Sequence, residues 1–129
     1  AILPPYVDRT LTPLQGLGVL DLLTGERALT EEVVALPTPG HTPGHMCLLI
    51  TSAGEKAIIL GDVVVHPAQV SEPDWVFSFD FDGQMAIATR KQVLESAEAE
   101  GMTLLQCHFP SPGYGRIVRL EGRRYWQTL

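Results

Sequence analysis

Short apolar runs separated by turn-forming residues make up most of the chain, which is the pattern of strands joined by tight connections. We expect strands at residues 19–23, 33–36, 46–51, 56–61, 103–107, 116–120 and 123–128. Residues 27–32 are polar and would connect two strands. The last two strands would form a hairpin about Glu121 and Gly122, because a glycine there permits a tight turn.

One long segment has a helical period instead. Asp82 suits the N-cap of a helix from about Gly83 to Glu100, and Gly101 would end it. Arg90 lies within its apolar stripe and would reach solvent or pair with a carboxylate. A shorter helix is expected at residues 11–17. The stripe of the long helix would face the core and consists of Ala86, Ile87, Arg90, Val93, Leu94 and Ala97.

The length of 129 residues indicates one domain over residues 1–129, and the order of strands, one long helix and further strands indicates the α/β class. The charge argues against two classes of partner. There are 9 Lys and Arg against 15 Asp and Glu, so the net charge is −6 and no basic cluster is present. Nucleic-acid and membrane binding are therefore not expected, and no apolar run is long enough to span a membrane. Cys47 and Cys107 lie in apolar runs, and we expect buried, reduced thiols in a cytoplasmic protein.

Two histidines lie in a stiff loop between two of the expected strands. The loop reads LPTPGHTPGH over residues 36–45, with His41 and His45 each following a Pro-Gly step. Proline fixes φ and glycine permits a turn, so the loop can hold an imidazole with little freedom, as a metal ligand requires. The alternative is a hairpin whose histidines are only polar turn residues.

Two further strands end in potential ligands. Asp62 follows the expected strand 56–61, and His108 follows the strand 103–107. Sites in α/β sheets lie at the carboxyl ends of strands, so these side chains are candidates for one site. An aspartate after an apolar run must be solvated, hydrogen-bonded or metal-bound. The alternative for Asp62 is a helix-cap or turn aspartate.

The segments PTPGHTPGH, ILGD and CHFPSPGYGR, in this order, resemble the carboxyl half of a metallo-β-lactamase-superfamily hydrolase, nearest its lactonase-like and organophosphate-hydrolase-like branch. The resemblance implies about half of the family's αββα sandwich, with a mixed sheet and one long helix. The family's first metal motif, H-x-H-x-D-H, would precede these segments. No histidine precedes His41 in this sequence.

The same resemblance implies a two-metal site. Asp62 would be the catalytic residue that bridges two ions of zinc or another divalent transition metal, with His41 as a ligand to one and His108 to the other. In the family, a metal-bound hydroxide attacks a small ester, lactone or phosphotriester. Without the first motif we expect a hydrolase fragment or subunit that binds metal weakly and has little or no activity alone. The alternative is a non-catalytic association domain.

Other residues are expected around this site. His45 would hold the loop through a hydrogen bond, and His66 is either a surface histidine or a substrate contact. Some lactonases of the family place a tyrosine three positions after the aspartate, where this chain has Val65, so Tyr114 or His66 could take its role. Residues 63–81 form a long aromatic loop that either covers the core or, by resemblance, helps wall the substrate cleft.

The expected strands also supply an apolar sheet face. In a complete sandwich this face would pack against the sheet of the other half. Left bare, it favours a homodimer or a complex with a chain that contains the missing half. The residues expected to share the face are Val33, Leu48, Ile50, Ile58 and Leu60.

Overall fold

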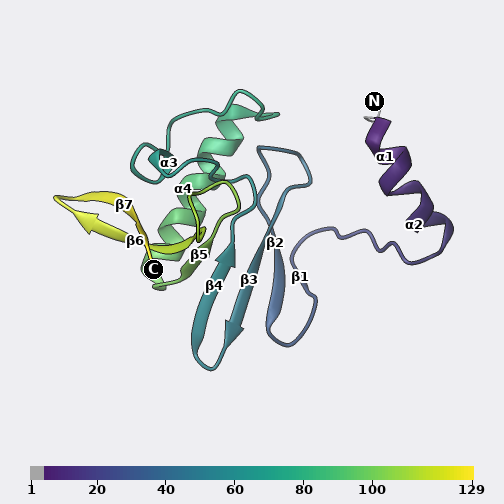
Figure 1. Ribbon diagram of the computed structural model, residues 1–129, viewed down its shortest axis with the longest axis horizontal. Coiled ribbons are helices and arrows are strands. Elements are labelled where there is room, and N and C mark those ends of the chain that lie inside the picture. The colour runs from purple at the N-terminus through teal and green to yellow at the C-terminus, as the bar shows by residue number, and fades with distance from the viewer. Residues whose placement is uncertain (1–4) are drawn as a thin grey trace.

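A seven-stranded mixed sheet forms the centre of the fold, and its strands lie side by side in chain order (Figure 1). The structure is a computed structural model and describes residues 5–129. All neighbouring strands are antiparallel except β4 and β5, which are parallel. The strands are β1 (Arg27–Ala28), β2 (Val33–Pro37), β3 (Met46–Ser52), β4 (Glu55–Ile59), β5 (Thr103–Leu105), β6 (Tyr114–Leu120) and β7 (Arg123–Thr128).

The parallel pair requires a long connection, and this connection contains two helices, α3 (Ala68–Ser71) and α4 (Gly83–Ala99). The helix expected after Asp82 is confirmed as α4. Its cap is formed as expected, because Asp82 Oδ1 accepts the Met85 N–H at 2.9 Å. Gly101 ends the helix with a φ of +62°.

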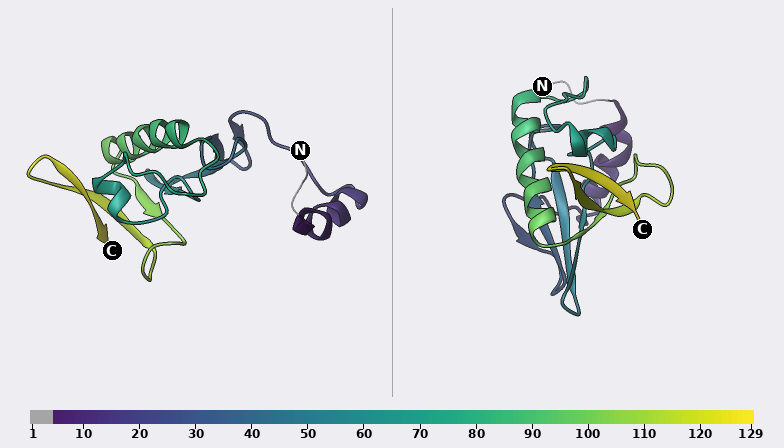
Figure 2. Two further views of the ribbon diagram at one scale, coloured as in Figure 1. Left: turned by 90° about the horizontal axis from the view of Figure 1, so that it is seen from above. Right: turned by 90° about the vertical axis from the view of Figure 1, so that its left-hand side faces the viewer.

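The apolar stripe of α4 packs on one face of the sheet. Ala86, Arg90, Val93, Leu94 and Ala97 are buried, as expected. Figure 2 (left) shows α4 lying along this face, with no helix of the described chain over the central strands on the other. The core between α4 and the sheet includes Cys47, Ile58, Leu60, Val64, Leu104 and Phe109.

The register of β3 and β4 corrects the expected composition of the apolar face. Leu48 lies opposite Ile59 and not Ile58. Ile58 and Leu60 therefore belong to the helix side and are buried in the core. A shift of one residue along a strand moves a side chain to the opposite face, and for this reason the expectation was wrong for these two. The face away from α4, called the open sheet face below, consists of Val33, Ala35, Leu48, Ile50, Ala57, Ile59, Thr103, Leu105 and Tyr114, of which only Ala35 is buried.

The strand expected at residues 19–23 is absent. Those residues are extended, but they have no neighbouring strand, and Leu22 is 82% exposed. An apolar sequence forms a strand only where its backbone groups find partners. Residues 27–28, expected to be only a connection, find such a partner in β2 and form β1.

Two short helices precede this segment and lie apart from the sheet in Figures 1 and 2. They are α1 (Pro5–Thr10) and α2 (Thr12–Gly16). The helix expected at residues 11–17 corresponds to α2, which begins with Pro13 in its first turn, where a proline costs no hydrogen bond. Leu14 and Leu17 are exposed.

The two cysteines differ in their surroundings. Cys47 is buried in the core, and burial raises its pKa to about 11. Cys107 is exposed, which corrects the expectation that both are buried. It lies beyond the end of β5, where the chain has already left the sheet.

Across residues 5–129 the structure contains no helix with the length and apolarity that a membrane span requires.

The expected C-terminal hairpin is confirmed as β6 and β7, and one carboxylate joins it to α4. Glu98 accepts hydrogen bonds from Arg119 at 2.7 and 2.8 Å and from Arg124 at 2.6 Å. These guanidinium groups, Arg119 first, lower the pKa of Glu98 from 4.5 to about 2. The depressed pKa means that Glu98 contributes stability above pH 4.5 and loses it as the pH falls towards 2.

We predict that Glu98→Gln lowers the free energy of unfolding by about 1 kcal/mol at pH 7. The difference from the wild-type protein should shrink between pH 4.5 and 2, because the wild-type carboxylate is then protonated. Urea unfolding across this pH range measures both effects. Glu95→Gln, on the same helix but exposed, is the matched control and should change little. A pH-independent difference for Glu98→Gln would contradict the prediction.

Candidate functional site

The histidine loop joins β2 to β3 and rests on α4. Gly40 has a φ of +139°, and a Cβ on it would lie only 2.4 Å from Ala86 Cα, so only glycine permits this approach. The Thr89 hydroxyl donates a hydrogen bond to the Pro39 carbonyl at 2.6 Å. These contacts fix the loop on the helix and thereby fix the position of His41.

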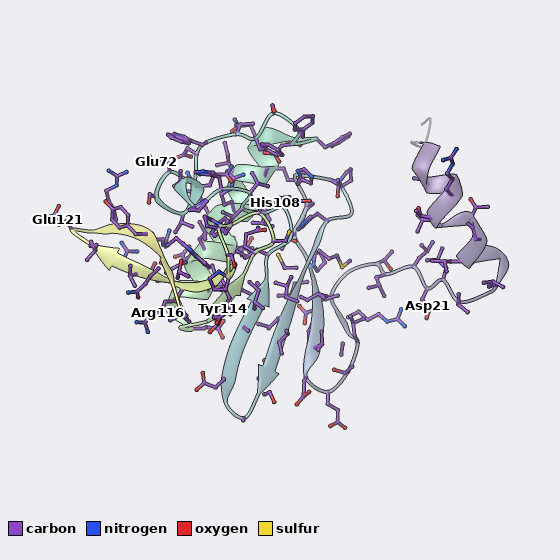
Figure 3. The ribbon with its side chains drawn as sticks, in the orientation of Figure 1. Asp21, Glu72, His108, Tyr114, Arg116 and Glu121 are labelled. Atoms are coloured by element: carbon purple, nitrogen blue, oxygen red, sulfur yellow. The ribbon has the colours of Figure 1, made fainter. Side chains whose placement is uncertain are left out.

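Three side chains expected at one site do meet. His41 Nε2 lies 3.4 Å from Asp62 Oδ2, and His108 Nε2 lies 2.8 Å from Asp62 Oδ1. Asp62 follows β4 and His108 follows β5. Because these two strands are parallel, their carboxyl ends lie at the same edge of the sheet. Figure 3 shows His108 at this edge, beside the loops that follow the strands.

His41, Asp62 and His108 are arranged as two pairs of possible metal ligands that share Asp62, and not as three ligands around one point. Each oxygen of Asp62 has one imidazole nitrogen beside it, from His41 on one side and His108 on the other. Catalytic zinc ordinarily has three protein ligands. Among the side chains that the structure describes, no group of three or more His, Cys, Asp or Glu is arranged to hold a metal ion. The chemistry of the donors suits a divalent metal, but the number of ligands does not, and their metal-binding role stays a prediction.

His45 connects the histidine loop to the turn that contains Asp62. The Asp62 N–H donates to His45 Nε2 at 2.9 Å, so the ring proton lies on Nδ1, which is 2.8 Å from Thr38 Oγ1. The Thr38 hydroxyl in turn donates to Cys47 Sγ, and the Cys47 thiol donates to the Leu60 carbonyl, each at 3.4 Å. Burial lowers the pKa of His45, which favours the neutral ring that this arrangement requires.

The approach of His45 explains the glycine before Asp62. Gly61 has a φ of +53°, and a Cβ on it would lie 2.5 Å from His45 Nε2. Only glycine combines this backbone conformation with this contact. The sequence ILGD therefore places Asp62 directly after a turn that the imidazole of His45 holds in position.

Gln106 is a site residue that sequence reasoning missed. It is 3% exposed, and its amide donates to the carbonyls of Gly61 and Val64 on either side of Asp62. Its Oε1 accepts the His108 N–H at 2.9 Å. Gln106 thus sets the separation of Asp62 and His108. The signal in the sequence was one polar residue at the end of an otherwise apolar strand.

Asp80 is a second missed residue. Its side chain is fully buried, and its Oδ1 lies 3.1 Å from His41 Nδ1. Its Oδ2 accepts the Phe77 N–H at 3.0 Å and lies 3.8 Å from Arg90 Nη2. Arg90 neither reaches solvent nor relies on a carboxylate alone, because it also donates to three backbone carbonyls. A buried arginine in a helix stripe was the only sequence signal of this pair.

A cavity of about 380 Å³ opens beside His108. Phe77 lines it and stacks on His41, with ring centroids 6.1 Å apart. Trp75 also lines it and is 58% exposed, so the aromatic loop borders the site and does not simply cover the core. The lining residues are Val65, His66, Gln69, Trp75, Val76, Phe77 and His108.

The structure places the other two candidate residues, His66 and Tyr114, at different hollows. His66 is exposed and lines the same cavity as His108, and its Nδ1 accepts the Ala68 N–H at 3.1 Å. Tyr114 begins β6 on the open sheet face and lines a different hollow, shared with Cys107. Figure 3 labels both Tyr114 and His108. Of the two proposed substitutes for a tyrosine near Asp62, His66 therefore lies on the cavity at the site.

Comparisons with known proteins show which proteins this chain resembles. No protein-family model matches the chain. The uncharacterized protein YobT of Bacillus subtilis strain 168 is 31% identical over 114 residues, a match that covers 84% of this chain and 44% of that protein. The chain therefore spans less than half the length of this curated relative.

Solved structures show the same partial coverage. Hydrolase AbOPH of the beta lactamase superfamily matches with a TM-score of 0.82 and 24% identity. The match covers 95% of this chain and 43% of the AbOPH chain. AidC, a dizinc quorum-quenching lactonase, has a TM-score of 0.77 and 26% identity, covering 96% and 44%. A probable metal-dependent hydrolase from Staphylococcus aureus has a TM-score of 0.73 and 20% identity, covering 87% and 42%.

We predict that His45→Ala destabilises the protein by about 1–3 kcal/mol, because it leaves the Asp62 N–H without its acceptor and the Thr38 oxygen without the donor from Nδ1. His66→Ala is the matched control, since that ring is exposed and contacts only its own loop, and it should change stability by less than about 0.5 kcal/mol. Thermal and urea unfolding give the comparison. Equal effects of the two substitutions would contradict the role of His45.

Proposed function

We infer that this chain forms part of a metal-dependent hydrolase, because it has part of the metallo-β-lactamase fold. The observation that supports this proposal most directly is the meeting of His41 and His108 on opposite oxygens of Asp62. A carboxylate flanked in this way can face two cations at once, with one imidazole for each.

In this proposal His41, Asp62 and His108 would hold divalent ions, with the carboxylate of Asp62 shared between the two histidines. Bound ions of this kind supply Lewis-acid polarisation of a carbonyl or phosphoryl oxygen. The chain itself contributes the orientation of these ligands, because His45 holds the backbone of Asp62 and Gln106 holds that of His108. The remaining ligands would have to come from polypeptide outside these 129 residues.

The cavity beside the site supports a substrate with an apolar group. Trp75, Val76 and Phe77 line it together with the ligand candidate His108. A small ester, lactone or phosphotriester has both features that this arrangement could bind, a polar reacting centre and an organic substituent. AidC, a structure similar to this chain, is a lactonase, and this likeness supports including lactones in the proposed class.

We predict that the chain alone holds little metal and hydrolyses lactones and phosphotriesters at close to the background rate. The reason is that each proposed ion would have one histidine and one shared carboxylate from this chain. Elemental analysis after dialysis and hydrolysis assays with and without a chelator check the two parts. Two tightly held ions per chain, or chelator-sensitive turnover that His41→Ala abolishes, would contradict it.

A second candidate function, a non-catalytic association domain, is favoured by the open sheet face. Ile59 in its centre is 37% exposed, and Tyr114 at its edge is 43% exposed. In the metallo-β-lactamase fold such a face packs against a second sheet. We propose that in the isolated chain a second copy covers this face and forms a homodimer, since one sheet can pack on its own copy.

We predict a homodimer at low micromolar concentration by sedimentation equilibrium and a monomer for Ile59→Lys, which places a charge in the open sheet face. Leu22→Lys is the matched control, because Leu22 is also apolar and exposed but lies in the extended segment before β1. If Leu22→Lys gives the monomer instead, association occurs through the N-terminal segment. If the wild-type chain is a monomer, the proposed self-association is wrong.

A further inference from the structure

We propose that Asp80 is the positioning residue of His41, and that it holds the imidazole proton on Nδ1 so that Nε2 presents its lone pair towards Asp62. The effect of Asp80 on metal binding by His41 rests on the proposed function, whereas the position of the proton on the His41 ring does not. Asp80 contacts His41 directly and would act on the site through it.

Where the His41 ring has one proton, two carboxylates compete for it. Asp80 Oδ1 lies 3.1 Å from Nδ1, which is a hydrogen-bond distance, whereas Asp62 Oδ2 lies 3.4 Å from Nε2. The Asp80 side chain is fully buried, whereas that of Asp62 is 35% exposed and can be solvated by water. A buried carboxylate needs donors more than a solvated one does, so the proton belongs on the Asp80 side.

Asp80 is itself held so that it can act as this acceptor. Its Oδ2 accepts the Phe77 N–H at 3.0 Å, which leaves Oδ1 directed at His41. The guanidinium of Arg90, 3.8 Å from Oδ2, places a positive charge beside it. Phe77 also stacks on the His41 ring, so the imidazole is restrained both in its plane and across its face.

Arg90 extends the arrangement to the other side of the site. Its Nε donates to the carbonyl of Val63, directly after Asp62, and its Nη1 donates to the carbonyls of Pro73 and Trp75, all at 2.8 Å. One buried arginine therefore connects the turn of Asp62, the aromatic loop and Asp80. The relative positions of His41 and Asp62 depend on this connection.

Long-range ¹H–¹⁵N NMR spectra of the metal-free chain at neutral pH test the proposal, because the two ring nitrogens have different shifts when protonated and unprotonated. The His41 signals are assigned with His41→Gln. We expect the wild-type ring to be protonated at Nδ1. Protonation at Nε2 in the wild-type chain would overturn the proposal without any further variant.

The variant Asp80→Ala removes the acceptor and should shift His41 towards the Nε2-protonated form. Asp80→Asn serves where the alanine variant fails to fold, and it should give a mixture of the two forms because an amide oxygen accepts more weakly than a carboxylate. Asp82→Asn, at the cap of α4, is the matched control and should leave the His41 signals unchanged. Unchanged signals in both Asp80 variants would overturn the proposal.

A titration with Zn²⁺ separates this inference from the proposed function. If the wild-type chain binds Zn²⁺ measurably, Asp80→Asn should weaken binding by about 10- to 100-fold and Asp82→Asn should not, as expected for a group that orients a ligand. Loss of affinity equal in both variants would contradict positioning by Asp80. Absence of Zn²⁺ binding in the wild-type chain agrees with the small number of ligands that this chain supplies in the proposed function, and the NMR result then decides the role of Asp80 by itself.

Discussion

The parallel pairing of β4 with β5 is the constraint on which the site depends. Ile59 lies opposite Leu105, and the Leu60 N–H continues the pairing to the Leu105 carbonyl at 3.0 Å. Since both strands run in one direction, the residues after them emerge at the same edge of the sheet. Asp62 and His108 are 46 positions apart in the chain, and because of this pairing Asp62 Oδ1 lies 2.8 Å from His108 Nε2. The long crossover that parallel strands require also supplies α4, on which the loop of His41 rests.

Buried polar side chains give this edge its geometry. His45, Gln106 and Arg90 each hydrogen-bond backbone groups within two residues of Asp62. No buried side-chain nitrogen or oxygen in the described part of the chain lacks a partner, so these groups offset the cost of their burial. The result is a carboxylate whose backbone is held from both sides and whose two oxygens face two imidazoles.

The open sheet face is the side of the sheet that no element of the described chain covers. One side of the sheet has a core against α4, whereas the side with Leu48, Ile50 and Ile59 has no covering element in the described chain. The chain covers 43% of AbOPH and 44% of AidC. The uncovered sheet face therefore goes together with a chain that spans less than half the length of the structures it resembles.

Sequence alone determined the long helix with its cap at Asp82, the C-terminal hairpin, most strands, and the partial metallo-β-lactamase fold, because these depend on local propensity and on motifs such as PTPGHTPGH and ILGD. It indicated His41, Asp62 and His108 as one set, but it placed Ile58 on the wrong face and predicted a strand at residues 19–23. Only the tertiary structure decided which face Ile58 occupies and whether residues 19–23 form a strand, since strand register and pairing depend on partners distant in the chain. It alone revealed Asp80 and Gln106 as well, because a hydrogen bond across 39 or 45 positions leaves no local pattern in a sequence.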